Sequence, residues 1–268
     1  MKQILLSAVL LFSWAFTQAQ TDTLYNESDT IRERTRIEVS FGNSDFDSTD
    51  NLKTRWFTFG LGPNLVHNQG DFSLGTANQI SEDFGNLRFG NSTNVEIGIV
   101  QQKLNLSKHK LNLQWGLGLD NNKFSFEEDF VIDQDANEYI RTTEGINGST
   151  KKNRLSATYV QVPLMLNYES STRHYNSIRI SAGGFAGLRI NSNQKIKFRD
   201  RDDNGINGKK KYKESDDFNL ENVVYGLKGE LGYGPVNLYA KYNLNDLFKE
   251  EVGQDLQLLS VGIMLVPF

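Results

Sequence analysis

The sequence has no cysteine, only four prolines among 268 residues, and no apolar run approaching the length of a membrane helix. The missing cysteine excludes a disulfide framework, a thiol nucleophile and cysteine-based zinc sites. A membrane-spanning helix needs about 20 consecutive apolar residues, so any crossing of a bilayer by this chain would have to use strands. The formal charge of −4 argues against nucleic acid as a partner.

The N-terminus is predicted to be a secretory signal peptide, residues 1–19. Lys2 supplies a positive start, residues 4–16 an apolar centre, and Ala19 a small residue at the position that a signal peptidase reads. Residues 20–53 are rich in Ser, Thr, Asp, Glu and Arg, and we expect them to form a flexible periplasmic leader. The chain is therefore expected to be exported.

The segment 111–120, L-N-L-Q-W-G-L-G-L-D, alternates strictly between large apolar residues and polar residues or glycine. A period of two marks a strand with one apolar and one polar face. A soluble sandwich turns its apolar face inward, whereas a transmembrane barrel turns that face toward lipid and lines a narrow lumen with the polar face. The remaining strands decide between the two.

Seven further segments show the same alternation, so the sequence predicts eight strands. Their expected ranges are 56–65, 94–106, 111–126, 159–168, 178–189, 223–233, 236–244 and 259–265. The apolar phase slips near Gln101, which predicts a β-bulge there. Pro163 cannot donate a ladder hydrogen bond, and we expect a second local bulge at this proline.

The connections between these strands are alternately long and short. The long ones are 66–93, 127–152, 199–217 and 245–255, and the short ones are 107–110, 169–176 and 234–235. Outer-membrane barrels have short periplasmic turns and long extracellular loops. A soluble barrel has no reason to gather its long loops at one end, so the alternation favours a membrane barrel.

Aromatic residues cluster at the ends of the predicted strands. Those expected at the periplasmic rim are Trp56, Phe57, Tyr168, Tyr233 and Phe268, and those expected at the outer rim are Tyr225 and Tyr242. Two aromatic girdles are typical of a barrel that spans a bilayer.

Several motifs resemble an outer-membrane-protein β-barrel family of Gram-negative bacteria, whose small members are called porin-like or PorT-like. The matching segments are W-F-T-F-G-L-G-P-N from Trp56, L-Q-W-G-L-G-L-D-N-N around Trp115, Y-V-Q-V-P-L-M-L from Tyr159, D-D-F-N-L from Asp216, Y-N-L-N-D-L-F from Tyr242 and the final V-P-F. The resemblance covers residues 54–268. It implies an all-β, eight-stranded antiparallel up-and-down transmembrane barrel in the bacterial outer membrane. It brings no functional residues, because most members have no assigned activity.

Charged residues fall on the predicted lumen face. They are Glu96, Arg179, Arg189, Lys228, Glu230 and Lys241, with a summed charge of +2. An eight-stranded barrel leaves an interior that side chains fill, and an unpaired charge there costs several kcal/mol. These groups are expected to form an ion-pair network that plugs the barrel. The alternative is a gate whose rearrangement passes small solutes.

The segment D-R-D-D-N-G in the 199–217 loop resembles the start of a calcium loop. Asp200, Asp202 and Asn204 would present oxygens at alternate positions, followed by a glycine for the turn. However, Lys211 stands at the twelfth position, where such a loop needs glutamate. The residues are weak candidates for a metal, and no cofactor is expected.

One histidine, His67, lies on the predicted outer side, with Asp71 and Ser73 nearby in sequence. Small outer-membrane hydrolases can build Ser-His or Asp-His sites at that rim. Nothing else in the sequence supports a catalytic site, and the chain is not expected to be an enzyme.

The leading functional hypothesis is a structural or partner-binding barrel with a plugged lumen. Its predicted outer loops 66–93, 127–152 and 245–255 carry net charges of −2, −4 and −3, an acidic crown that suits divalent ions, basic ligands or an extracellular or envelope protein. Outer-membrane lipid would surround the barrel. A small gated channel is the alternative, and a rim-sited hydrolase or a secreted lipocalin-like carrier fits less well, because a carrier needs an apolar cavity.

Overall fold

The structure is a computed structural model that describes most of the chain from residue 51 onward. The described ranges are 51–68, 71–73, 87–88, 91–108, 110–127, 130–132, 141–142, 150–171, 177–198, 211–249 and 256–266. The expected signal peptide and almost all of the expected leader lie outside these ranges. No helix within them is long and apolar enough to cross a membrane.

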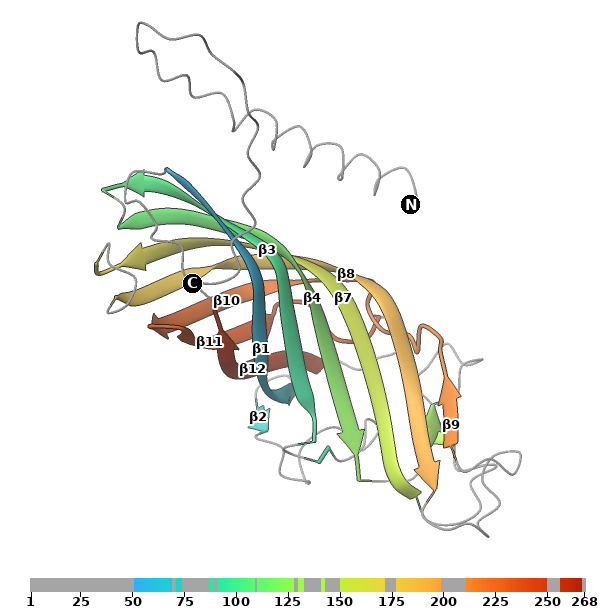
Figure 1. Ribbon diagram of the computed structural model, residues 1–268. Helices are drawn as coiled ribbons and strands as arrows, with labels where there is room; N and C mark the ends of the chain where they lie inside the picture. Colours follow the sequence, from blue (N-terminus) through green and yellow to red (C-terminus); the bar gives the residue numbers. More distant parts are fainter. Residues whose placement is uncertain are drawn as a thin grey trace, which may run out of the picture. The chain divides into compact units, whose positions relative to one another are not determined.

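Eight antiparallel strands close into a ring (Figure 1). In ring order they are β1 (Leu52–Asn68), β3 (Thr93–Ser107), β4 (Leu111–Phe126), β7 (Thr150–Glu169), β8 (Ile178–Phe198), β10 (Val223–Tyr233), β11 (Val236–Asn243) and β12 (Leu256–Leu265). Each strand pairs with its sequence neighbours in the ring, and β12 returns to pair with β1. The predicted fold class is therefore confirmed.

Four short strands lie outside the ring. β2 (Asp71–Ser73) pairs with β1, and β9 (Lys211–Glu214) pairs with the outer end of β8. β5 (Val131–Ile132) and β6 (Arg141–Thr142) pair only with each other. All four belong to the long connections, so the additional strands gather at one end of the barrel.

The two faces of the ring have the composition that a bilayer demands. Along β4 the even-numbered positions from Asn112 to Phe126 are buried, while Leu111 and its odd-numbered successors up to Leu119 face outward. Ten outward apolar side chains are more than half exposed, namely Leu164, Leu166, Ile180, Ile190, Leu227, Leu231, Tyr233, Leu238, Ile263 and Leu265. A belt of exposed large apolar residues with a polar interior is the inverse of a soluble sandwich.

The connections differ in length as the sequence predicts. β10 and β11 are joined by Gly234 and Pro235, and Gly234 adopts a φ of +57°, which glycine tolerates at no steric cost. The other two turns at that end span residues 108–110 and 170–177. The four long connections follow the opposite ends of the strands, the arrangement typical of outer-membrane barrels, and that end is here called the outer end.

Two ring strands are much longer than the sequence indicates. β7 has 20 residues and β8 has 21, whereas a bilayer needs about 9–11 residues of tilted strand. The expectation that 127–152 is loop throughout was wrong, because β7 begins at Thr150. The predicted strand ending at Arg189 is also too short, because β8 continues to Phe198. The outer halves of β7 and β8 run on past the last pair between β8 and β10, while β7 stays paired with β4 as far as Asn153; together with β9 they are here called the blade (Figure 1).

One predicted bulge is present and the other is absent. The register between β3 and β4 shifts between Gly98 and Val100, two to three residues before the expected position. The register of β7 with β4 and with β8 is the same on both sides of Pro163, so the predicted bulge at the proline was wrong. Instead, β4 and β7 have no pairs between Trp115–Leu164 and Gly118–Gln161, as expected where a proline lacks its N–H.

A backbone irregularity in β1 faces the β3 bulge. Phe57 has a φ of 52°, unusual for a bulky residue, and the side chains of Trp56 and Phe57 are consecutively exposed. The alternation therefore reverses at this point, so Arg55 lies on the lumen side. Both aromatic residues lie at the predicted periplasmic rim, with Tyr168 and Tyr233 also exposed there. Phe268 lies outside the described residues.

Candidate functional site

The centre of the barrel holds a buried lysine between two glutamates. Lys228 on β10 forms ion pairs with Glu96 on β3 and with Glu230, whose Oε1 lies 3.2 Å from the Lys228 Nζ. The Lys228 amine also lies 5.9 Å from the centre of the Tyr239 ring. All of these side chains are buried, so the contacts join opposite walls of the lumen through its interior.

A second ion pair lies toward the outer side of the first. The Lys241 Nζ on β11 is 2.5 Å from Asp120 Oδ1 on β4, and it donates a hydrogen bond to Gln161 Oε1 at 3.3 Å. The same amine lies 5.4 Å from the centre of the Phe185 ring. Lys241 is 1% exposed, so its charge depends on these partners rather than on water.

Asparagine side chains extend this layer across the lumen. Asp120 accepts hydrogen bonds from Asn94 at 2.6 Å and from Asn122 at 2.8 Å. Asn94 accepts in turn from the Tyr239 hydroxyl at 2.7 Å, and Asn122 accepts from Asn64 at 3.2 Å. The network thus links β1, β3, β4 and β11, and it satisfies the buried carboxylate of Asp120 on both oxygens.

The periplasmic half of the lumen carries a separate group of charges. Lys103 on β3 pairs with Glu169 at the end of β7. Arg179 donates to Asn237 at 2.8 Å and to the backbone of the β10–β11 turn. Arg55 donates to Gln101 at 3.3 Å. The periplasmic end of the lumen therefore holds one basic residue on each of β1, β3 and β8.

The space left between these layers is small. A cavity lined by Thr58, Glu96, Gln161 and Lys228, among others, has a volume of about 20 Å³. Roughly 10–15 Å³ is needed to hold one water molecule. This part of the lumen has room for about one water and no larger solute.

Beyond the polar layers, the inward positions become apolar and form one cluster, here called the apolar cap. Its members are Val66, Leu87, Phe124, Phe126, Phe130, Ile132, Leu155, Ala157, Tyr159, Phe185, Phe218, Leu220, Val224, Leu247, Phe248, Leu256 and Leu258. The cap joins ring strands to residues of all four long connections, so the outer end of the barrel is filled by its own loops.

Polar side chains dock the β5 segment onto this cap. The Asn153 amide donates to the Phe130 carbonyl at 2.8 Å, and the Ile132 N–H donates to Gln194 Oε1 at 3.0 Å. The rings of Phe126 and Phe130 meet edge to face with centroids 4.8 Å apart. Buried backbone groups of the connection are thereby satisfied.

One predicted network residue is placed elsewhere. Arg189 lies at the outer mouth, where it donates to Ser192 at 2.8 Å, to the Asp217 carbonyl at 2.6 Å and to Asn222 at 2.6 Å. It therefore fastens the connection before β10 to β8 and does not join the ion pairs. The other five predicted residues, Glu96, Arg179, Lys228, Glu230 and Lys241, are buried in the lumen.

Four charged residues of the lumen were not part of the predicted ion-pair network. Asp120 was placed on the lumen face without a partner, Glu169 was assigned to a turn, and Arg55 and Lys103 fell where the alternation reverses. Their partners on distant strands could be identified only once the order of strands in the ring was known. Together with the predicted residues they give each buried lysine a carboxylate.

An ion pair also lies outside the membrane-spanning part. Lys249 Nζ is 2.7 Å from Asp217 Oδ2 at the base of the cap. Partial burial raises the pKa of Asp217, but hydrogen bonds from Lys249 and from the Asn219 backbone outweigh it and leave the pKa below its ordinary value.

The remaining sequence candidates fall largely outside the described residues. This holds for Asp200, Asp202 and Asn204 of the calcium-like loop, and for the side chains of His67, Asp71 and Ser73. Within the part that the structure describes, no group of three or more His, Asp or Glu side chains is arranged to hold a metal ion.

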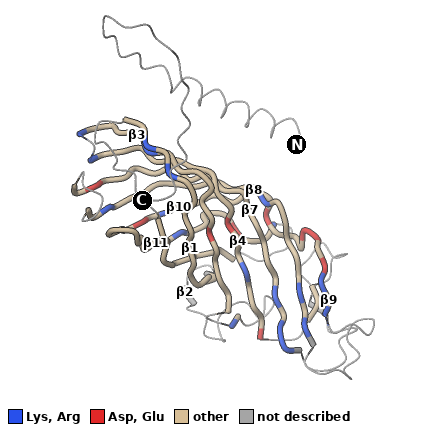
Figure 2. Tube along the Cα trace, in the orientation of Figure 1, with Lys and Arg blue, Asp and Glu red and all other residues tan. Residues whose placement is uncertain are grey.

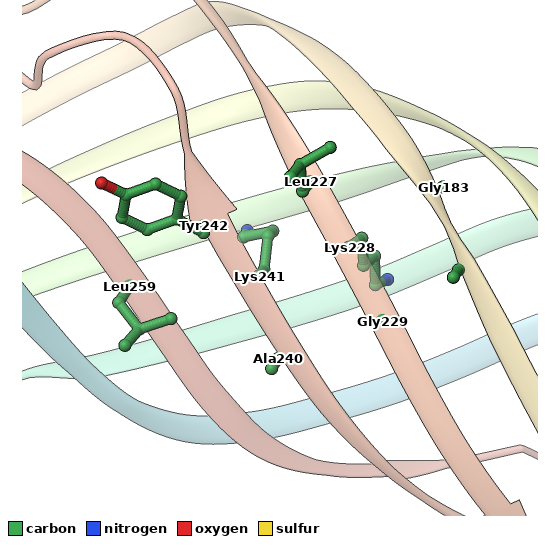
Figure 3. Close-up of a pocket in the computed structure, with 9 residues that line it drawn as sticks. Gly183, Leu227, Lys228, Gly229, Ala240, Lys241, Tyr242 and Leu259 are labelled. Carbon is green, nitrogen blue, oxygen red and sulfur yellow. The ribbon is translucent and has the colours of Figure 1, made fainter.

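The outer wall has a groove of about 560 Å³ across β8, β10, β11 and β12 (Figure 3). Ala182, Gly229 and Ala240 lie directly opposite one another on neighbouring strands and form its shallow floor. Leu227 and Leu259 border it. The groove faces lipid and offers mainly apolar surface.

Comparison with known protein families identifies the family to which this chain belongs. A family model described as an outer membrane protein beta-barrel domain matches residues 18–249. The chain belongs to this family. The outer membrane barrel therefore lies in the bacterial outer membrane. No curated protein matches the chain.

Two solved structures of Ail, the attachment invasion locus protein of Yersinia pestis, are similar in fold. One, in complex with the heparin analogue sucrose octasulfate, is 13% identical, covers 79% of this chain and 98% of its own, and has a TM-score of 0.33. The other is 11% identical over the same shares with a TM-score of 0.31.

Proposed function

We propose that this outer membrane barrel is a closed, non-conducting protein that serves a structural or partner-binding role at the cell surface. The observation that supports the proposal is that two sets of side chains fill the lumen. Ion pairs of Lys228 and Lys241 cross its middle, and the apolar cap fills its outer end. A solute would have to break both layers to pass.

The energetic argument for a closed state rests on burial. Breaking a buried ion pair leaves an uncompensated charge, which costs about 3–5 kcal/mol. Lys228, Lys241 and Lys103 are each almost completely buried beside a carboxylate, so opening the lumen would separate several such pairs. A spontaneous wide opening would therefore be rare.

The partner-binding role rests on the cap and the blade. The cap contains residues of all four long connections, the blade extends β7 and β8 past the last pair with β10, and neither is needed to complete the ring. The proposed acidic crown lies mainly in connections outside the described residues, and an extracellular or envelope protein remains the partner that it would suit.

A small gated channel is the second candidate. It is favoured by buried polar atoms with no hydrogen-bond partner among the described residues, including Glu96 Oε2 and two nitrogens of Arg179. Such atoms could exchange partners during a rearrangement or bind a small polar solute. This candidate predicts frequent small openings, whereas the closed barrel predicts very few.

Conductance across planar bilayers tests the proposal. The purified wild-type barrel should give no stable large conductance, and Glu230→Ala should raise the frequency of small openings by weakening the hold on Lys228. Glu214→Ala, which changes the same residue type on β9 outside the ring, should behave as wild type. Steady porin-sized currents from the wild-type monomer would contradict the closed barrel.

A further inference from the structure

The outward face of the blade carries six basic residues on two rungs. Lys152, Lys197 and Lys211 lie directly opposite one another on β7, β8 and β9, and Arg154, Lys195 and Lys213 form the next rung. These six residues are here called the basic face. Figure 2 shows the basic residues along these strands.

The basic face lies just beyond the membrane. On β8, exposed apolar side chains run from Ile178 to Ile190, about 40 Å of strand, which spans a hydrocarbon core when tilted by about 45°. Lys195 and Lys197 follow five and seven residues after Ile190. At about 3.3 Å per residue and the same tilt, they stand roughly 12–16 Å above the apolar belt. This is the level of lipid headgroups and of sugars attached to them.

The charges are fixed in place by the other side of the blade. Leu155 and Ile196, which alternate with the basic residues, are completely buried in the protein interior. A strand cannot rotate its outward side chains inward without exposing such residues. The basic face is therefore presented to the surroundings of the barrel wall on a rigid support.

The arrangement is unfavourable without a counter-charge. Like charges directly opposite one another on neighbouring strands destabilise a sheet. The charge of Arg154 is the main cause that lowers the pKa of Lys152, and the charge of Lys211 is the main cause that lowers the pKa of Lys195. Within the described ranges, no ion pair joins the basic face to an acidic side chain. The negative charge that would neutralise the face therefore has to come from another molecule or from another part of the chain.

We propose that the basic face binds the phosphate and carboxylate groups carried on the sugars of outer-leaflet glycolipid. The face belongs to the same outward surface as the lipid-facing belt and continues it along the same strands. Headgroups of glycolipids that surround the wall would therefore lie against it, without any rearrangement of the barrel. This inference depends on the outer-membrane location and not on whether the lumen is closed.

Binding of rough lipopolysaccharide, whose lipid and inner-core sugars carry phosphate and carboxylate, tests the proposal. The full-length barrel in a non-ionic detergent is titrated with fluorescently labelled lipopolysaccharide, and the apparent Kd is read from anisotropy. A lysine close to an anionic surface strengthens binding by roughly fivefold. Lys195→Gln combined with Lys213→Gln should therefore weaken binding about thirtyfold, and raised salt should weaken wild-type binding steeply.

Matched controls show whether weaker binding results from loss of the basic face, from misfolding or from the change in net charge. Lys108→Gln combined with Lys110→Gln removes the same charge from the periplasmic turn and should leave the Kd unchanged. The blade variant should keep the gel mobility of the folded barrel, because removing opposed like charges relieves repulsion. Dephosphorylated lipopolysaccharide should bind the wild type much more weakly than the intact form.

Three results would overturn the proposal. An unchanged Kd in the blade variant would show that acids of neighbouring connections already neutralise the face. An equal loss in the periplasmic control would show that only net charge matters. Displacement of lipopolysaccharide by dextran sulfate at equal or lower charge concentration would assign the face to soluble polyanions rather than to membrane glycolipid.

Discussion

The ion pair between Asp120 and Lys241 offers a quantitative test of the lumen. Asp120→Asn keeps the size of the side chain but removes its charge and sets an amide against the donors of Lys241, Asn94 and Asn122. Asp120 is 2% exposed, so water cannot replace the lost partner. Removing one member of a buried pair costs about 3–5 kcal/mol, which is the loss in unfolding free energy that we expect.

A double-mutant cycle measures the interaction energy between Asp120 and Lys241 separately from the other effects of each substitution. Lys241→Met removes the amine but keeps a side chain of similar length, and alone it should also destabilise the barrel by leaving Asp120 without its cation. Because Asp120→Asn and Lys241→Met remove the two charges together, the double variant should cost at least about 2 kcal/mol less than the sum of the single variants. Urea unfolding in lipid vesicles, followed by tryptophan fluorescence, measures all four proteins.

The control for this cycle is Lys110→Met on the exposed periplasmic turn, which should change stability by no more than about 0.5 kcal/mol. Additive effects of Asp120→Asn and Lys241→Met would refute the reasoning, because they would show that the two charges do not depend on each other. Single-variant losses as small as that of Lys110→Met would show that water reaches the pair.

Two further predictions concern the wall and the outer connections. Leu164→Arg, on the lipid-facing side of β7, should cost about 2–4 kcal/mol of unfolding free energy, whereas Gln114→Leu on the lumen side should cost much less; equal losses would mean that the faces are reversed. The lowered pKa of Asp217 means that its pairing with Lys249 stabilises the fold above the unfolded pKa near 4 and is lost as the pH falls below it. Asp217→Asn should therefore reduce the difference between urea midpoints at pH 7 and pH 3, and an unchanged difference would contradict this role.

The ring could be predicted because the bilayer and the lumen impose the same period on every strand. Segments such as 111–120 show large apolar residues on one face only, and the long connections occur at one end. Each strand could therefore be found, and its faces assigned, without knowledge of its neighbours. The family and the outer-membrane location followed from the same segments.

The blade was not predicted because, outside the membrane, outward positions no longer carry apolar residues. In residues 150–158 and 190–198, Leu155, Ala157 and Ile196 are buried together with the polar side chains of Asn153, Ser192 and Gln194, and the outward positions beyond Ile190 are basic or polar. Buried apolar residues such as Leu155 and Ile196 beside outward basic ones are typical of a soluble sheet, and this part of the pattern is opposite in sense to the membrane-spanning half of the same strands. The predicted strands therefore began at Tyr159 and ended at Arg189, nine residues short of the observed ends of β7 and β8.

The partners within the lumen could not be predicted for a different reason. Lys241 and Asp120 are 121 positions apart and lie on strands that are not neighbours in the ring, so only the closed geometry brings them together. Lys103 and Arg55 depend in addition on the irregularities at Ile99 and Phe57, which reverse the alternation. Small shifts in the position of a bulge decide which charges enter the lumen.

The closed lumen can be tested most directly by chemical labelling, since the natural chain has no cysteine. Ser181→Cys and Ser260→Cys place a thiol of nearly the original size at two buried lumen positions on opposite sides of the Lys228 layer, and Lys110→Cys places one on an exposed turn. With the barrel in lipid vesicles, a water-soluble maleimide should label Lys110→Cys readily and neither lumen variant until the protein is unfolded. Labelling of both lumen cysteines in the folded barrel at the rate of the turn cysteine would contradict a closed lumen.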